Sequence, residues 1–257
     1  MNAVEVRNLS FNYEGAFVFD NINFNVKKGS FLTVIGKGGS GKSTLFNIIS
    51  GNLVYDGSIS IFDMSINTAL ESGILGFVSL KYDDFTESMV MEELINVLKK
   101  RGKDFEIIKN DIEKISIKLN INPILNKKIS SLSTKEKLLF KFTLQLLLRP
   151  KVLIIDNCFS FFDFEKNDII RELKRVFKKS TVINITNDVN ECLFGQEVLF
   201  LKDNLYKKNV FLLDSEDFLS NELDVPFIIL LSEKLKFYGL IDKTYLDVER
   251  LIGDLWE

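Results

Sequence analysis

Residues 31–49 read FLTVIGKGGSGKSTLFNII, an apolar run that ends in a glycine-rich turn and continues as an amphipathic segment. The apolar run predicts a buried strand, and the segment after the glycines predicts a helix. Gly36, Gly41, Lys42 and Ser43 fit the spacing G-x-x-x-x-G-K-[ST] of a P-loop, a motif that requires this strand–loop–helix context. The sequence therefore favours a phosphate-binding loop over an ordinary strand–turn–helix.

The residue types of this loop suit a nucleoside triphosphate. Glycines let backbone N–H groups turn toward one point without crowding by Cβ atoms, and the following helix directs the positive end of its dipole there. Lys42 supplies a full charge for the outer phosphates, and Ser43 supplies a hydroxyl to Mg²⁺. We expect the chain to bind a nucleoside triphosphate or to descend from one that did. The expected nucleotide-binding residues of the loop are Gly36, Lys37, Gly38, Gly39, Ser40, Gly41, Lys42, Ser43 and Thr44.

Composition narrows the possible functions. The 257 residues carry a formal net charge of −3, which gives no electrostatic case for nucleic acid as a partner. No apolar run is long enough to span a bilayer, and the first residues show no signal-peptide pattern, so we expect a partner to hold the protein at any membrane where it works. The two cysteines, Cys158 and Cys192, form no paired motif and fit a reducing compartment. The sequence contains no histidine, which excludes any mechanism that needs an imidazole from this chain.

Strand-like and helix-like patterns alternate along the chain around a helical insert. Alternation of apolar and polar residues predicts strands within residues 3–35, and apolar residues recur with the helical period from about residue 89 to 149. From residue 151 onward, predicted strands and helices alternate again. This order predicts an α/β fold with a P-loop NTPase core of mostly parallel sheet and flanking helices, an antiparallel β subdomain and an inserted α-helical subdomain. The expected segments are an N-terminal β subdomain with the first part of the core (1–79), the helical subdomain (80–149), the second part of the core (150–213) and a C-terminal helical unit (214–257).

A second candidate site residue, Asp156, follows four apolar residues in KVLIIDN (151–157). A strand that ends in Asp at this distance after a P-loop is typical of the carboxylate that reaches Mg²⁺ through water, while Ser43 binds the ion directly. Apolar strands also end in Asp for purely structural reasons. The pattern gains weight from the P-loop and from the helical insert between them, and it makes Ser43 and Asp156 the expected metal-side residues.

The order of these elements resembles the ATP-binding subunits of ABC transporters over nearly the whole chain. Residues 8–51 are similar to the N-terminal segment of that family, and the resemblance implies that the ligands are ATP and Mg²⁺. It also places Tyr13 where the family has an aromatic ring that stacks on adenine. The alternative for Tyr13 is a strand aromatic packed in the core.

Four further segments carry the resemblance. ISSLSTKEK (129–137) falls at the family's signature, where L-S-G-G-Q is usual; CFSFFD (158–163) falls at its D-loop, with Asp163 in the expected place; and TVINITND (181–188) falls at its switch strand. The tail, residues 225–252, is similar to energy-coupling factor (ECF) importer ATPases around Pro226, Leu235 and Gly239. The resemblance implies that the signature residues contact a nucleotide held by a second subunit, through Leu132, Ser133, Thr134 and Lys135.

The chain departs from the family's pattern in four places, three single catalytic positions and the signature. Asn157 stands at the catalytic glutamate, Asn187 at the switch histidine and Leu80 at the glutamine before the helical insert, while Thr134 and Lys135 replace the two signature glycines. An amide cannot accept a proton from the attacking water, and the loss of a general base lowers the rate by about 10²–10⁴. We therefore predict a weak or inactive hydrolytic site at this chain's own P-loop.

One assignment stays open, because a shift of the loop alignment by a residue or two would put one of residues 81–84 at the glutamine position. No shift restores the histidine, since the chain has none. Lys135 is expected either to replace lost N–H contacts to phosphate by its charge or to be a solvated lysine at a helix start.

ABC ATPases work as head-to-tail pairs, so a pair of two identical copies would carry every defect in both sites. The resemblance therefore implies a heterodimer with a second, catalytically intact ABC ATPase subunit. It also implies an integral membrane transporter subunit, contacted through residues 80–93 with Tyr82, Phe85 and Met89, and a peripheral location on the cytoplasmic face of the membrane. The alternative for the three side chains is that they pack inside the helical subdomain. The alternatives for the function of the chain are a subunit that holds ATP and never hydrolyses it, and a small-molecule kinase.

Overall fold

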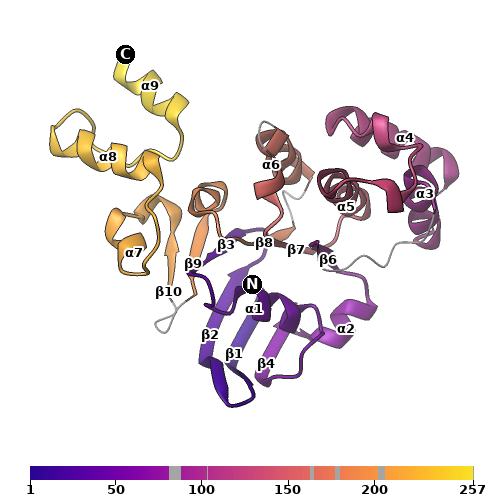
Figure 1. The fold of residues 1–257 in the computed structure, drawn as a ribbon, viewed down its shortest axis with the longest axis horizontal. Helices are drawn as coiled ribbons and strands as arrows, with labels where there is room; N and C mark the ends of the chain where they lie inside the picture. Colours follow the sequence, from indigo (N-terminus) through magenta and orange to yellow (C-terminus); the bar gives the residue numbers. More distant parts are fainter. Residues whose placement is uncertain (81–87, 103, 163–164, 177–179, 202–205, 257) are drawn as a thin grey trace. The chain divides into compact units, whose positions relative to one another are not determined.

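The computed structural model describes residues 1–80, 88–102, 104–162, 165–176, 180–201 and 206–256 (Figure 1). The chain divides into two compact units. One comprises Met1–Thr68 with Ile183–Glu257, and the other comprises Ala69–Val182. Each unit contains strands covered by helices, which confirms the predicted α/β fold.

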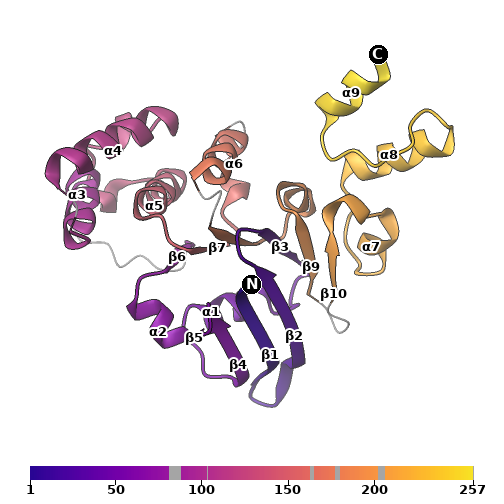
Figure 2. The same cartoon turned by 180° about the vertical axis from the view of Figure 1, so that it is seen from behind.

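The first unit contains a four-stranded antiparallel sheet, in the order β2-β1-β4-β5. These strands are β1 (Asn2–Tyr13), β2 (Ala16–Lys27), β4 (Asp56–Ile61) and β5 (Met64–Ser65), of which β1, β2 and β4 lie side by side in Figure 2. Alternate residues of β1, such as Val4 and Val6, are fully buried, and Val4 pairs with both Val26 and Ile61. Burial of these side chains fixes the register around Val4–Val6, because a slip by one residue would expose them, whereas the rest of β1 pairs with β2 through several register shifts.

The same unit carries the P-loop between β3 (Phe31–Ile35) and α1 (Lys42–Ile49). All five residues of β3 are buried, as expected for a strand that is covered on both faces. It runs parallel to β9 (Glu197–Phe200), which in turn pairs antiparallel with β10 (Tyr206–Asn209). Thr186, directly after β8 (Thr181–Ile185), donates its N–H to the carbonyl of Val34, so the end of β8 also lies beside β3.

The C-terminal segment packs onto this sheet as α7 (Ser215–Leu219), α8 (Phe227–Phe237) and α9 (Val248–Trp256). Its largest contribution is Phe218, whose ring lies edge-on to Phe200 of β9 at 5.6 Å between centroids. The shared buried cluster consists of Ile35, Cys192, Val198, Phe200, Val210, Leu213, Phe218, Ile228, Ile229, Tyr245 and Leu251. The helices therefore continue the core of the first unit.

The second unit combines a parallel strand pair with helices. β6 (Leu75–Val78) runs parallel to β7 (Val152–Asp156), with Val78 opposite Ile155. The helices are α3 (Val90–Lys100), α4 (Phe105–Lys118), α5 (Thr134–Leu148) and α6 (Glu165–Val176), and a short α2 (Ile66–Glu71) joins the units in sequence. Helices α3, α4 and α5 pack together around fully buried Leu94, Leu98, Ile108, Ile112 and Leu138. Among the described helices, none has the length and apolar content needed to cross a bilayer.

Candidate functional site

The backbone of the P-loop takes a shape that its glycines make possible. Gly39 and Gly41 have φ of +83° and +90°, in the left-handed region that other residues rarely adopt. A Cβ at Gly41 would lie 2.6 Å from the Phe19 ring and 2.7 Å from Val18, whereas a Cβ at Gly39 would meet nothing within 4 Å. The loop is therefore tight against β2 on one side and open at Gly39, where a ligand can approach the backbone.

Lys42 folds back over this loop. Its ammonium donates to the carbonyl oxygens of Gly36 (2.5 Å) and Lys37 (2.8 Å) and to Ser40 Oγ (3.3 Å), and the residue is 8% exposed. Ser43, by contrast, is exposed at the first turn of α1. A buried ammonium, an exposed hydroxyl and the N–H groups of a helix start are the donors and ligands that a magnesium-bound triphosphate needs, so the residues fit this group.

Tyr13 lies at the end of β1 with its ring 49% exposed and edge-on to Phe11, at 4.8 Å between centroids. The ring is therefore not packed in the core. Its stacking on adenine stays a prediction.

The switch position also lies in the first unit. Asn187 is exposed, directly after the buried Thr186 at the end of β8. Beneath this turn lies a buried pair that sequence reasoning missed. The Asn184 amide donates to Glu191 Oε2 at 2.8 Å, and both residues have 0% exposure. The sequence gives no signal for this pair, because Asn184 lies within the mainly apolar strand TVINI, where its partner Glu191 cannot be inferred.

The second unit carries Asp156 and Asn157 at the carboxyl end of β7. Asp156 is 9% exposed, and Asn157 adopts a φ of +51° in the left-handed region, where Asn is better tolerated than most residues. The thiol of Cys158 lies 3.3 Å from the carbonyl oxygen of Val78 and 3.1 Å from that of Asp156, so it closes the turn onto the end of β6.

Leu80 follows β6 and is half-buried, next to a second feature that the sequence did not reveal. The ammonium of Lys141, in α5, donates to the carbonyl of Ser79 at 2.5 Å, and Lys141 is 5% exposed. A buried lysine thus ties the start of the segment after β6 to α5. The predicted coupling residues Tyr82 and Phe85, and the predicted D-loop residue Asp163, lie outside the described residues.

The signature segment begins α5 with a capping box. Ser133 Oγ accepts from the N–H of Glu136 (3.3 Å), and the Glu136 carboxylate accepts from the N–H of Ser133 (2.9 Å). The hydrogen bond from Lys127, at 2.7 Å, and that from the Ser133 N–H lower the pKa of Glu136 from 4.5 to about 2. Leu132 is buried, whereas Ser133 and Thr134 are exposed and Lys135 is half-buried. The hydroxyl of Ser133 therefore lies at the surface, at the start of a helix.

The predicted residues that the structure describes are divided between the two units. The first unit holds Tyr13, the P-loop and Asn187. The second holds Asp156, Asn157, Leu80 and the signature.

Comparisons of the sequence and of the fold with known proteins point to one family. Residues 19–160 match the family model described as ABC transporter. The energy-coupling factor transporter ATP-binding protein EcfA1 of Streptococcus thermophilus is 28% identical, with 99% of this chain and 98% of that protein covered. EcfA of Malacoplasma penetrans is also 28% identical, with coverages of 98% and 93%.

Among solved structures, cbiO1 from Clostridium perfringens, part of the ABC transporter complex cbiONQ, superposes with a TM-score of 0.70 at 21% identity, over 92% of this chain and 95% of that one. An ATP-binding subunit of an ABC transporter gives a TM-score of 0.74 at 18% identity over 99% and 100%. These likenesses show the fold, and the family match covers more than half of the chain. They confirm the resemblance found in the sequence: the chain belongs to the ABC transporter family, as one of its ATP-binding subunits.

Proposed function

We propose that the chain is the nucleotide-binding subunit of an ECF-type transporter that retains Mg-ATP at its own P-loop and relies on a second ATPase chain for hydrolysis. The proposal rests on the contrast between a retained P-loop and missing catalytic residues. The P-loop has its glycines, lysine and serine in a phosphate-binding arrangement, whereas Asn157 follows Asp156 and the chain has no histidine.

The residues of this chain have separate roles toward the ligand. The N–H groups at the start of α1 and the Lys42 ammonium would bind the phosphates, and Ser43 would ligate Mg²⁺, which would supply charge for the phosphate oxygens. Asp156 stays the second metal-side residue that the sequence predicts. Tyr13 stacks on the base. Asn157 presents an amide, which cannot take a proton from water, so hydrolysis at this P-loop is slow.

The signature supports the pairing with a second ATPase. Ser133 has an exposed hydroxyl at the N-terminus of α5, where a phosphate bound by another chain would meet a hydroxyl and helix N–H groups. A homodimer would lack the catalytic glutamate and histidine in both sites, so the partner must supply them. The names of the relatives that match nearly the whole chain support a place in a transporter. We infer that the chain lies at the cytoplasmic face of a membrane subunit, which it contacts through residues 80–93.

The purified chain tests the first half of the proposal. Alone, it should bind Mg-ATP in calorimetry and release negligible phosphate, and brisk hydrolysis by the isolated chain would contradict the degenerate site.

The second half needs an intact ABC ATPase from the same genome, co-expressed with this chain. Turnover should appear in the co-purified pair and vanish when the partner's catalytic glutamate is replaced by glutamine. Turnover that survives this replacement, or a failure of the two chains to associate, would contradict the heterodimer.

A further inference from the structure

An ion pair joins the P-loop to the C-terminal segment. The ammonium of Lys37, the second residue of the loop, contacts the carboxylate of Glu222, which lies 185 positions later in the sequence and just after α7. The side chains of Lys37 and Glu222 are 61% and 54% exposed, so solvent and ligands reach the pair. The contact lies within the first unit.

The backbone at Glu222 is held in a defined shape. Glu222 has a φ of +55°, its N–H donates to the carbonyl of Leu219 at 3.0 Å, and the N–H of Leu223 donates to that of Phe218 at 2.9 Å. Asn221, 5% exposed, donates its side-chain amide to the carbonyl of Asp217 (2.7 Å) and to the hydroxyl of Tyr206 (2.9 Å). The carboxylate therefore projects from a fixed turn and not from a loose loop.

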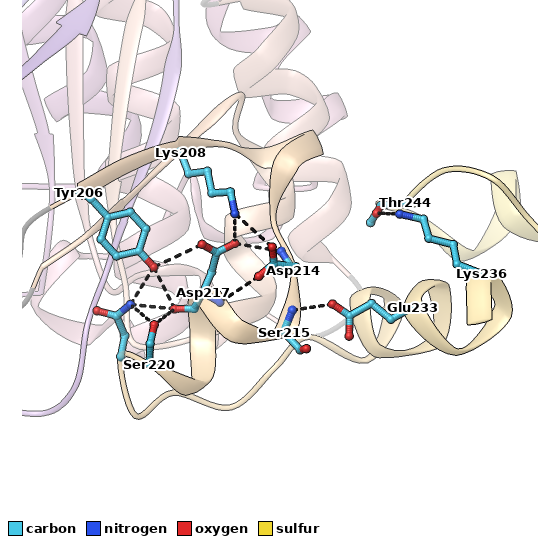
Figure 3. Close-up of polar contacts among 10 residues, drawn as sticks. Tyr206, Lys208, Asp214, Ser215, Asp217, Ser220, Glu233, Lys236 and Thr244 are labelled. Atoms are coloured by element: carbon cyan, nitrogen blue, oxygen red, sulfur yellow. Dashed lines mark hydrogen bonds and ion pairs between the residues drawn. The ribbon is translucent and has the colours of Figure 1, made fainter.

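Polar contacts continue from this turn into the C-terminal helices, as Figure 3 shows. Asp217 accepts from Lys208 at 2.7 Å, and Lys208 also reaches Asp214 at 3.2 Å. The N–H of Ser215, at the start of α7, donates to Glu233 Oε1 of α8 at 2.6 Å. A continuous set of contacts thus runs from the P-loop to α8.

We propose that Lys37 is a second phosphate-binding cation and that Glu222 is its exchangeable counter-ion, so that the C-terminal segment and the triphosphate compete for one ammonium group. The proposal rests on the ATP binding proposed above. Lys37 projects from the loop whose N–H groups collect the phosphates, and the triphosphate carries more negative charge than one carboxylate. Binding of the triphosphate therefore draws Lys37 away from Glu222 and breaks the contact between the P-loop and the turn after α7.

Calorimetric titration of the full-length chain with Mg-ATP tests this competition. Glu222→Gln removes the counter-charge and keeps the side-chain shape, so the affinity should rise roughly two- to fivefold, the range typical of one exposed ion pair. Lys37→Met should weaken binding by a similar factor. The gain should shrink at high ionic strength, because the pair is exposed.

The double variant Lys37→Met with Glu222→Gln shows whether Glu222 acts through Lys37. If it does, Glu222→Gln has no further effect in the Lys37→Met background. Glu216→Gln is the matched control, because Glu216 is an exposed carboxylate of the adjacent α7, and it should bind as the wild type does. Unchanged affinity in Glu222→Gln, or an equal gain with and without Lys37, would overturn the proposal.

The same titrations separate this proposal from the proposed function. A wild-type chain that fails to bind Mg-ATP would contradict both the proposed function and the competition for Lys37. A wild-type chain that binds, with Lys42→Ala impaired and Glu222→Gln unchanged, removes only the competition.

Discussion

Lys42 is the charged side chain of the P-loop that we propose to bind the phosphates. Its ammonium makes three contacts with the loop itself, so it already lies where the phosphates would bind. Replacement by alanine removes charge-assisted hydrogen bonds, and we expect Lys42→Ala to weaken Mg-ATP binding by roughly 10- to 100-fold in calorimetry. Lys28→Ala, at an exposed position after β2, is the control. Unchanged affinity in Lys42→Ala would mean that the loop no longer serves nucleotide.

Asn157, which the sequence predicts at the position of the catalytic glutamate, adopts a backbone conformation that limits its replacement. Because its φ is +51°, Asn157→Glu should lower the free energy of unfolding by about 1 kcal/mol in urea denaturation, and Asn157→Gly should lower it less. We also expect Asn157→Glu to leave phosphate release by the isolated chain negligible, since no histidine accompanies the new carboxylate. Restored hydrolysis in this variant would show that the glutamate alone was missing.

At the scale of elements, the start of α5 depends on pH through Glu136. Its pKa is about 2 in the folded chain and 4.5 ordinarily, so folding favours the charged carboxylate. This contribution to stability is fully present above pH 4.5 and is lost as the pH falls toward 2. Glu136→Gln should therefore unfold more easily than the wild type at neutral pH, and the difference should vanish at the acid end.

Urea denaturation at several pH values measures this effect. Glu113→Gln, on the exposed face of α4, serves as the control and should follow the wild-type curve. A constant gap between Glu136→Gln and the wild type across the acid range would contradict the role of this carboxylate.

Elements set by local sequence were predictable, and contacts across long sequence separations were not. The apolar run in KVLIIDN (151–157) forms β7, because a short apolar run between turns has few other ways to bury its side chains. The contact of Lys141 with Ser79 joins residues 62 positions apart, and no local pattern around Lys141 indicates it. The left-handed backbone at Asn157 was equally hidden, since Asn occurs in many conformations.

At the scale of the whole molecule, the C-terminal helices are part of the stability of the first unit. Phe218 and Ile229 are fully buried against the core that includes Ile35 and Phe200. Burial of each large apolar side chain contributes about 1.5–3 kcal/mol, so a chain that ends at Leu213 should be insoluble or should melt well below the full chain. Trp256→Ser, at an 86% exposed position, should melt as the wild type does. A truncated chain with an unchanged melting temperature would show that the tail folds independently.

The two thiols give each compact unit its own chemical reporter. Cys158 belongs to Ala69–Val182 and Cys192 to the other unit, both are fully buried, and burial raises the pKa of Cys192. An alkylating reagent can therefore modify either sulfur only when the surrounding structure opens. Peptide mass spectrometry of a timed labelling reaction would give two opening rates from one unmodified protein, and added nucleotide would reveal which half it protects.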